Sequence, residues 1–234
     1  MKALSAALVA SLLLTACATG PGPETRREFY ERRVLRANPS KVIATELAFA
    51  RTAQEKGQWT AFAEFATDDA TMFVPEPVNA KDWLKRQVNP PRAVAWQPHQ
   101  VWSSCDGSLA VARGAWQRPD GTFGQFTTVW QREDNREYKW VVDVGNTLDE
   151  PLEAPAMIAA EVAECGVPLT EDVVRFEHDG ANRVGGAERQ DLARDSTLET
   201  HYRWLPTGGT LTVRLQRGGR LETVHEQPIA GSGG

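Results

Sequence analysis

Two polar side chains of the chain, His99 and Asp143, lie on segments expected to be strands, where they could transfer protons. Asp143 follows the apolar run Trp140–Val142, and an inward carboxylate there could act as a general base or hydrogen-bond acceptor. Burial among aromatic residues would raise the pKa of that carboxyl toward neutrality. His99 could serve as a general acid or base, or contact a ligand. Asp143 could equally be structural, by pairing with Arg113 or facing solvent, and His99 could be an exposed strand residue.

Arginine and aromatic residues supply the candidates for ligand binding. Arg113 interrupts a strand of small and apolar residues, so it must pair with an acid, face solvent or bind an anionic ligand, and pairing is favoured. The residues that could form a ligand-binding wall are Trp59, Phe73 and Trp83, with Arg113 and Asp143 as polar contacts. Plain core packing is the alternative for the aromatic rings. Asp68 and Asp69 could flank the opening of such a site, or cap a junction between a helix and a strand.

Cofactor and metal chemistry find no support in the sequence. The three histidines of the second half are His178, His201 and His225, and they lack the close spacing of a metal site. The chain has no serine-nucleophile motif, phosphate loop or dinucleotide fingerprint. We therefore expect no metal and no cofactor. The net charge of −5 also argues against nucleic acid as a partner, because binders of nucleic acid are basic.

The first seventeen residues carry a chemical signal of another kind. Lys2 precedes an apolar run, Ala3–Leu14, that is too short for a bilayer of ~30 Å and suits a secretory leader. The segment Leu14-Thr15-Ala16-Cys17 resembles a bacterial lipobox. This resemblance implies cleavage after residue 16 and acylation of Cys17 by chains such as palmitate, which anchor the protein in the lipid bilayer. An ordinary thiol beyond a conventional signal peptide, or an uncleaved anchor, are the alternatives.

Ala18 and the remaining cysteines bear on the compartment. In lipoproteins that this leader resembles, Asp after the acylated Cys retains the protein in the inner membrane. Ala18 therefore implies a periplasm-facing anchor in the outer membrane, or in the cell membrane if the host has no outer membrane. Cys105 and Cys165 remain as an even pair, and an oxidising compartment favours a disulfide between them over two unpaired thiols.

The elements that must position these residues follow an α+β order. Apolar spacing predicts a helix with Ser40 as its N-cap and Gly57 just after its end, a second short helix that carries Trp59, and a third helix capped by Asn79. A short strand, Ala70–Val74, lies between the last two. Four antiparallel strands in a meander are then expected at Val94–Ser103, Leu109–Gln117, Phe123–Arg132 and Tyr138–Val144.

The chain divides into six expected parts. These are a signal peptide (1–16), a lipidated Cys with a flexible tether (17–39), an α+β domain (40–150), a linker with one or two helical turns (151–170), a β-rich C-terminal region (171–229) and a disordered tail (230–234). Strands of the C-terminal region are expected at Val173–His178, Thr197–Leu205, Thr210–Gln216 and Leu221–Gln227, with a loop at 179–196. They could form a meander of their own or extend the first sheet.

Residues 41–148 resemble the nuclear transport factor 2-like (SnoaL-like, cystatin-cone) superfamily. The resemblance rests on the opening helix Val42–Gln54, the segment Gly57–Pro75 with its aromatic helix and acidic pair, and the hairpins of Leu109–Asp143. It implies helices packed on a curved antiparallel sheet, which leave a cone that can admit a small molecule. It also implies a homodimer built through the open sheet face.

Two functions fit this resemblance. The first is a membrane-anchored, periplasm-facing lipoprotein whose cone binds a small apolar ligand or a protein partner. The alternative is a cofactor-free lyase or isomerase with Asp143 or His99 as its base. Polar groups that converge inside the cone would favour the enzyme, and a filled apolar cone would exclude it.

Overall fold

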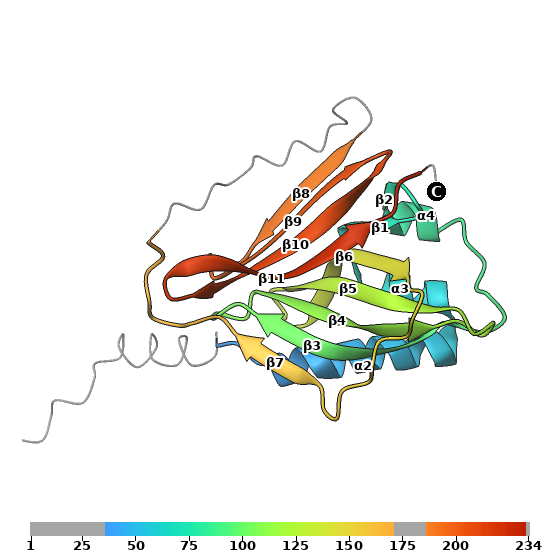
Figure 1. The fold of residues 1–234 in the computed structure, drawn as a ribbon. Coiled ribbons are helices and arrows are strands. Elements are labelled where there is room, and N and C mark those ends of the chain that lie inside the picture. Colours follow the sequence, from blue (N-terminus) through green and yellow to red (C-terminus); the bar gives the residue numbers. More distant parts are fainter. Residues whose placement is uncertain (1–35, 171–185, 233–234) are drawn as a thin grey trace, which may run out of the picture. The chain divides into compact units, whose positions relative to one another are not determined.

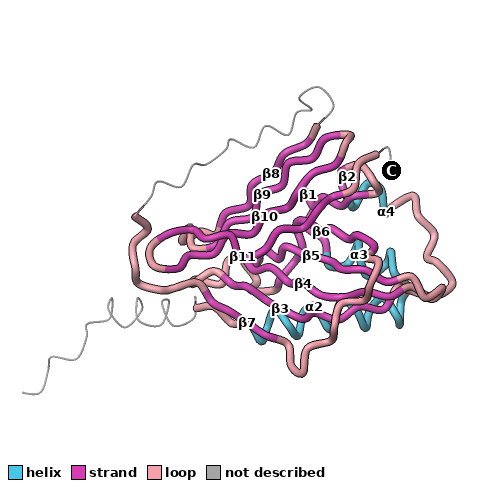
Figure 2. The backbone as a smooth tube through the Cα atoms, in the orientation of Figure 1, coloured by secondary structure: helices cyan, strands magenta, loops and turns pink. Residues whose placement is uncertain are grey.

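The computed structural model describes residues 36–170 and 186–232. These residues form an α+β fold, in which three helices lie on one face of a curved sheet of seven mostly antiparallel strands (Figures 1 and 2). A second sheet of four antiparallel strands follows later in the chain. The expected fold class is confirmed. No helix in the described part of the chain is long and apolar enough to cross a membrane.

Helix α2 (Pro39–Lys56) begins two residues earlier than the apolar spacing suggests. Its N-cap is Asn38, whose side-chain oxygen accepts a hydrogen bond from the Lys41 amide at 3.2 Å. Pro39 suits the first helical position because its missing N–H has no partner there in any case. Ser40, the expected cap, is therefore the second residue of the helix.

The short helices that follow are capped by asparagines. Gly57 separates α2 from α3 (Gln58–Phe65) and has a φ of 104°, a backbone conformation that residues other than glycine rarely adopt. The Asn89 side chain, thirty residues along the chain, accepts a hydrogen bond from the Trp59 amide at 2.7 Å at the start of α3. Helix α4 (Ala80–Leu84) is capped by Asn79 as predicted. Asn89 thus fixes the position from which Trp59 projects.

The seven-stranded sheet has the order β2-β1-β6-β5-β4-β3-β7. Its strands are β1 (Ala66–Phe73), β2 (Pro77–Asn79), β3 (Ala95–Ser103), β4 (Leu109–Gln117), β5 (Phe123–Arg132), β6 (Tyr138–Thr147) and β7 (Ala159–Val162). Strands β3 to β6 form the expected meander of antiparallel hairpins. Strand β1, which follows α3, pairs with β6 in parallel and so extends the sheet beyond the last strand of the meander.

The C-terminal region forms a sheet of its own, with the order β11-β10-β9-β8. Its strands are β8 (Ala187–Leu192), β9 (Leu198–Leu205), β10 (Gly208–Arg217) and β11 (Arg220–Ile229). Of the two arrangements left open by the sequence, the separate meander is therefore the one formed. The tail keeps contact beyond β11, because the Ala230 carbonyl accepts a hydrogen bond from Trp204 Nε1 at 2.9 Å.

Alternating side chains give the first sheet two buried faces. One face packs on the helices, with Trp130 and Trp140 fully buried at its centre. The other face packs on the C-terminal sheet, where Val129 and Val142 meet Leu211 and other apolar residues. The Gln227 side chain of β11 also donates a hydrogen bond to the Val144 carbonyl of β6 at 3.0 Å. The homodimer stays a prediction, and the sheet face expected to mediate it is covered by the chain's own C-terminal sheet.

Two expectations about secondary structure are wrong. The alanine-rich part of the expected linker forms strand β7 instead of helical turns, because it pairs in parallel with the edge strand β3 from Gln100 to Ser103. The expected loop at 179–196 contains strand β8, which pairs with β9. The charged residues of this segment favoured a loop prediction, but an edge strand such as β8 can accommodate charged side chains. The expected strand Val173–His178 lies outside the described residues.

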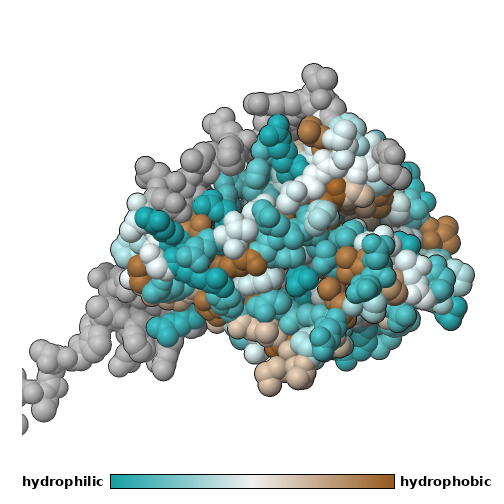
Figure 3. Space-filling model, in the orientation of Figure 1, coloured by the Kyte–Doolittle hydropathy of each residue, from teal (hydrophilic) through white to brown (hydrophobic). Residues whose placement is uncertain are grey.

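The view in Figure 3 shows the surface of the described residues by hydropathy. Hydrophobic residues form small, separate groups among hydrophilic ones on this face. Isolated groups of this kind are normal on a protein surface and indicate no binding site by themselves. The site is therefore sought in a cavity.

Candidate functional site

A cavity of about 220 Å³ lies between the helices and the sheet face that they cover. Aromatic side chains dominate its wall, and they are Phe49, Trp59, Phe62, Phe73, Trp96, Trp116 and Phe126. Helices α2 and α3 and five strands of the first sheet contribute lining residues. Apolar cavities with a few polar groups are typical ligand sites. The cone is therefore hollow rather than filled.

Asp143 lies in the wall of this cavity. Its neighbours in β6, Val142 and Val144, pack toward the C-terminal sheet, so alternation along the strand turns Asp143 to the helical side. Thr128, which lies opposite Asp143 on the neighbouring strand β5, donates a hydrogen bond from Oγ1 to Asp143 Oδ2 at 2.8 Å. Burial raises the pKa of the Asp143 carboxyl to about 6, and the bond from Thr128 opposes that rise. A carboxyl with this pKa can both accept and release a proton near neutral pH.

Glu46 is a second carboxyl behind the cavity wall, and it escaped the sequence analysis. It lies fully buried in the middle of α2, where its two oxygens accept hydrogen bonds from Trp96 Nε1 at 2.9 Å and Trp130 Nε1 at 2.8 Å. Burial raises the pKa of Glu46 to about 8; the two indole N–H groups lower it, and the charge of Asp143 raises it. Trp96 lines the cavity, so Glu46 fixes the orientation of part of the wall. The available signal was a charged residue within the apolar stripe of α2, four residues after Val42 and three before Phe49.

The raised pKa of Glu46 predicts that this group makes the protein less stable as the pH rises from about 4.5 to 8, while the lowered pKa values of His225 and His99 act in the opposite direction below about pH 6.5. In this range the folded state keeps a proton on Glu46 that the unfolded state, with its ordinary pKa of 4.5, has released. The free energy of unfolding should therefore fall by up to about 1.4 kcal/mol per pH unit. Urea denaturation at pH 6.5 to 8, above the range in which Asp143, His99 and His225 contribute, measures this slope.

Glu46→Gln should flatten that slope above about pH 6.5, where Asp143, His99 and His225 no longer contribute. The matched control is Glu64→Gln, which removes an exposed carboxyl that pairs with Lys56 and should leave the slope unchanged. An unaltered slope in the Glu46 variant would contradict a buried, protonated Glu46.

Arg113 and His99 lie outside the cavity lining. Arg113 pairs with Thr127 across the sheet and Asp143 pairs with Thr128, and consecutive residues of one strand face opposite ways. The Arg113–Asp143 pair, one of the alternatives that the sequence leaves open, is therefore not formed. The Arg113 guanidinium instead donates to Gln125 Oε1 at 3.3 Å. His99 occupies an irregular point of β3, where burial and then the charge of Arg113 lower its pKa.

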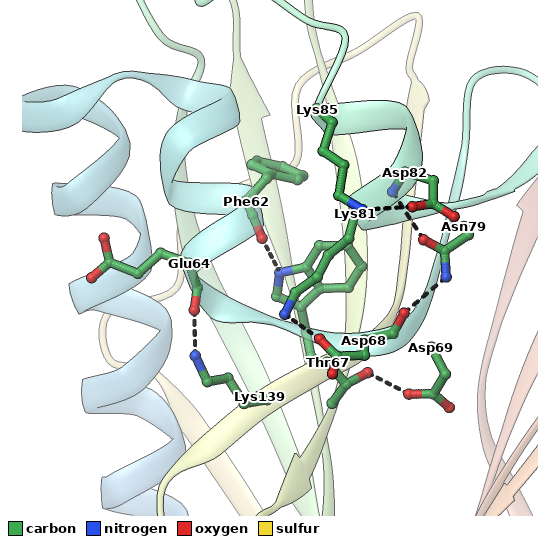
Figure 4. A network of polar contacts seen from close by, with 11 residues as sticks. Phe62, Glu64, Thr67, Asp68, Asp69, Asn79, Lys81, Asp82, Lys85 and Lys139 are labelled. Carbon is green, nitrogen blue, oxygen red and sulfur yellow. Dashed lines mark hydrogen bonds and ion pairs between the residues drawn. The ribbon is translucent and has the colours of Figure 1, made fainter.

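The acidic pair of β1, Asp68 and Asp69, is not among the residues that line the cavity, and Figure 4 shows its contacts. Asp68 forms an ion pair with Lys81 of α4 at 2.6 Å. Asp69 accepts a hydrogen bond from Thr67 Oγ1 at 2.7 Å, and it pairs with Arg189 of β8 at 3.0 Å. Both carboxylates therefore hold structural contacts rather than flank the opening.

Of the other predicted aromatic and metal-binding candidates, some line the cavity and others lie outside it. Trp59 and Phe73 line the cavity, whereas Trp83 packs behind Trp59 with ring centroids 5.3 Å apart. His201 pairs with Glu188, His225 contacts the Thr127 hydroxyl, and residue 178 lies outside the described ranges. Within residues 36–170 and 186–232, no three His, Cys, Asp or Glu side chains are grouped as a metal site would need. That the protein uses no metal or cofactor stays a prediction.

The two cysteines of the described part form a disulfide. Cys105 in the β3–β4 turn and Cys165 after β7 are bonded, with Cα atoms 5.5 Å apart. The predicted pairing is confirmed. The leader and Cys17 lie outside the described residues, so the lipid anchor stays a prediction.

Comparison of the sequence with known protein families and with curated proteins gives no match. Among solved structures, the chain is similar to a "putative ketosteroid isomerase" from Parabacteroides distasonis, with 14% identity, 50% of this chain and 97% of that one covered, and a TM-score of 0.39. A "putative aromatic ring hydroxylase" from Novosphingobium aromaticivorans has 12% identity, coverage of 53% and 93%, and a TM-score of 0.35.

An "NTF2-like protein of unknown function" from Shewanella baltica is similar at 13% identity, with 53% and 97% covered and a TM-score of 0.31. Similarity at this level carries no information about activity. The helix-covered curved sheet of residues 37–163 is the α+β cone that the sequence predicts, and its function has to be inferred from the cavity itself.

Proposed function

We propose that this protein is a lipid-anchored, periplasm-facing lipoprotein whose cone binds a small, largely apolar molecule. The observation that carries the proposal is the hollow, aromatic-lined cavity of about 220 Å³ with the Asp143 carboxyl in its wall. An interior that served only for stability would be close-packed, because voids cost free energy. Asp143 would give the bound molecule a single fixed polar contact.

Filling the cavity tests this binding function. Gly145 lies two residues after Asp143 in the cavity wall, and a Cβ there meets its nearest atom, Trp116 Nε1, at an ordinary 3.5 Å. We expect Gly145→Leu to occupy the cavity and to weaken binding of the fluorescent probe N-phenyl-1-naphthylamine by at least about tenfold. Probe fluorescence and the quenching of the lining tryptophans measure this.

Thr210→Leu is the matched control for the binding experiment. Thr210 is exposed on β10, in the C-terminal sheet, so this variant adds the same kind of side chain away from the cavity. It should bind the probe as the wild type does. Equal affinity in the wild type and the Gly145 variant, with both folded by circular dichroism, would contradict binding in the cone.

Proton transfer by Asp143 is a second candidate function, favoured by the pKa of about 6 for this carboxyl. A base of this strength in an apolar cavity suits abstraction of a proton from carbon, as in a lyase or isomerase. Deuterium exchange next to the carbonyl of cyclohexanone, followed by NMR in D₂O, reports such a step. Exchange that is accelerated by the wild type and lost in Asp143→Asn would establish the enzyme, and no acceleration would favour the binding function.

The anchor is supported by the lipobox-like segment Leu14–Cys17 and by the disulfide, which is typical of an oxidising compartment. We expect Cys17→Ser to move the protein from the membrane to the soluble fraction of its host, because no acyl chains can be attached. Mass spectrometry of the membrane-bound wild type should show the acylated cysteine. Unchanged membrane partitioning and mass in the variant would contradict the anchor.

A further inference from the structure

Asp143 is the acidic side chain of the cavity wall. Asp143 is one of two ionisable residues in the wall, and no ion pair with it is formed among the described residues. The second is Arg118, which is exposed to solvent and is therefore screened from the interior. Behind the wall lies the carboxyl of Glu46, whose partners are the N–H groups of Trp96 and Trp130. The buried part of the wall thus offers the Asp143 carboxylate without a cation beside it, and Glu46, which keeps its proton at neutral pH, adds no charge.

The rings around Asp143 are of the kind that attracts positive charge. The faces of tryptophan and phenylalanine carry a negative electrostatic potential, and a cation within ~6 Å of a ring centre is attracted to it. The protein itself shows this contact at the cavity wall, where the Arg118 guanidinium lies 5.0 Å from the ring centre of Trp116. A carboxylate surrounded by such rings combines the two features that bind ammonium groups.

A neutral or anionic occupant would suit the cavity less well. A neutral apolar molecule would strip water from Asp143 without supplying an opposite charge, and this desolvation costs free energy. An anion would be repelled by the Asp143 carboxylate. An organic cation with a compact apolar body neutralises Asp143 and fills the aromatic space at the same time.

We infer that the ligand of the cone is an organic cation, an amine or a quaternary ammonium compound, whose charged nitrogen lies beside Asp143. This inference rests on the proposed function, because it requires that the cone binds a ligand at all. It adds the chemical class of that ligand. The positive charge, rather than apolar area, then decides which molecules the cone selects.

Two probes of nearly identical shape test the inference. Benzyltrimethylammonium and neopentylbenzene share their skeleton, and they differ in a nitrogen that carries a positive charge in place of a carbon. We expect the wild type at pH 8 to bind the ammonium compound at least about tenfold more tightly than the carbon analogue. Calorimetry and tryptophan fluorescence measure both affinities, and this comparison needs no variant.

Asp143→Asn keeps the shape of the side chain and removes its charge. In this variant the affinity for the ammonium compound should exceed that for the carbon analogue by about threefold or less. This remaining preference comes from the attraction between the cation and the aromatic rings. Thr210→Leu, on the far sheet, should keep the full preference. A preference that survives in Asp143→Asn would overturn the role of that carboxylate.

The outcomes separate this inference from the proposed function. If the wild type binds the carbon analogue as tightly as the cation, the cation inference is overturned and the binding function stands. If N-phenyl-1-naphthylamine binds and neither shape-matched probe does, the cation inference is likewise overturned. If no probe binds the wild type, both proposals fail.

Discussion

Replacing Arg189 by methionine is expected to lower the free energy of unfolding by about 3–5 kcal/mol, the usual cost of removing one partner from a buried ion pair. Arg189 is only 6% exposed, and its Nε lies 3.0 and 2.9 Å from the two carboxylate oxygens of Asp191, which is 12% exposed. Its other nitrogens donate to the backbone carbonyl and the carboxylate of Asp69, at 2.8 and 3.0 Å. The variant would leave the Asp191 charge buried without its guanidinium. Urea denaturation measures the loss.

Arg217→Met is the matched control for this prediction. Arg217 also pairs with carboxylates, Glu161 at 2.7 Å and Glu222 at 3.7 Å, yet its side chain is 45% exposed. Exposed ion pairs contribute about 1 kcal/mol or less, because water and salt screen them. A loss below about 1 kcal/mol for Arg189→Met as well would contradict its role as the buried tie between β1 and β8.

Reduction of the disulfide is expected to lower the free energy of unfolding by about 4 kcal/mol. The bond closes a loop between residues 60 positions apart, and in the chain-entropy model a loop of that length restricts the unfolded state by this amount. It joins the β3–β4 turn to the segment that leads toward the C-terminal sheet. Denaturation with and without dithiothreitol measures the difference.

The double variant Cys105→Ser, Cys165→Ser controls for other effects of the reductant. It should be as unstable as the reduced wild type, and dithiothreitol should not change it further. A fully reduced wild type, verified by mass, that unfolds at the same urea concentration as the oxidised form would refute the prediction.

Much of the α+β domain follows from local patterns in the sequence. Apolar spacing located α2 and α3, and strands β4 and β5 have the bounds predicted for them, Leu109–Gln117 and Phe123–Arg132. The misses, β7 and β8, are strands that exist because a neighbouring strand supplies hydrogen-bond partners. Such pairing depends on residues distant in the sequence, so local composition favours the wrong assignment.

The candidate site was predictable only in part. Asp143, Trp59 and Phe73 were singled out from the sequence and lie in the cavity wall. Arg113 was expected beside Asp143, but strand register turns it to the opposite face. Register across a sheet is set by the fit of all its strands, and a shift of one residue reverses every side chain.

The sequence by itself determined the order of the main helices and strands in the α+β domain and the even pair of cysteines, because these depend on neighbouring residues and on composition. Only the tertiary structure decided that Glu46 accepts hydrogen bonds from Trp96 and from Trp130, 84 residues away, and that the C-terminal sheet covers the outer face of the first. The physical reason is that burial, and with it the pKa of a carboxyl group, is created by packing between distant segments.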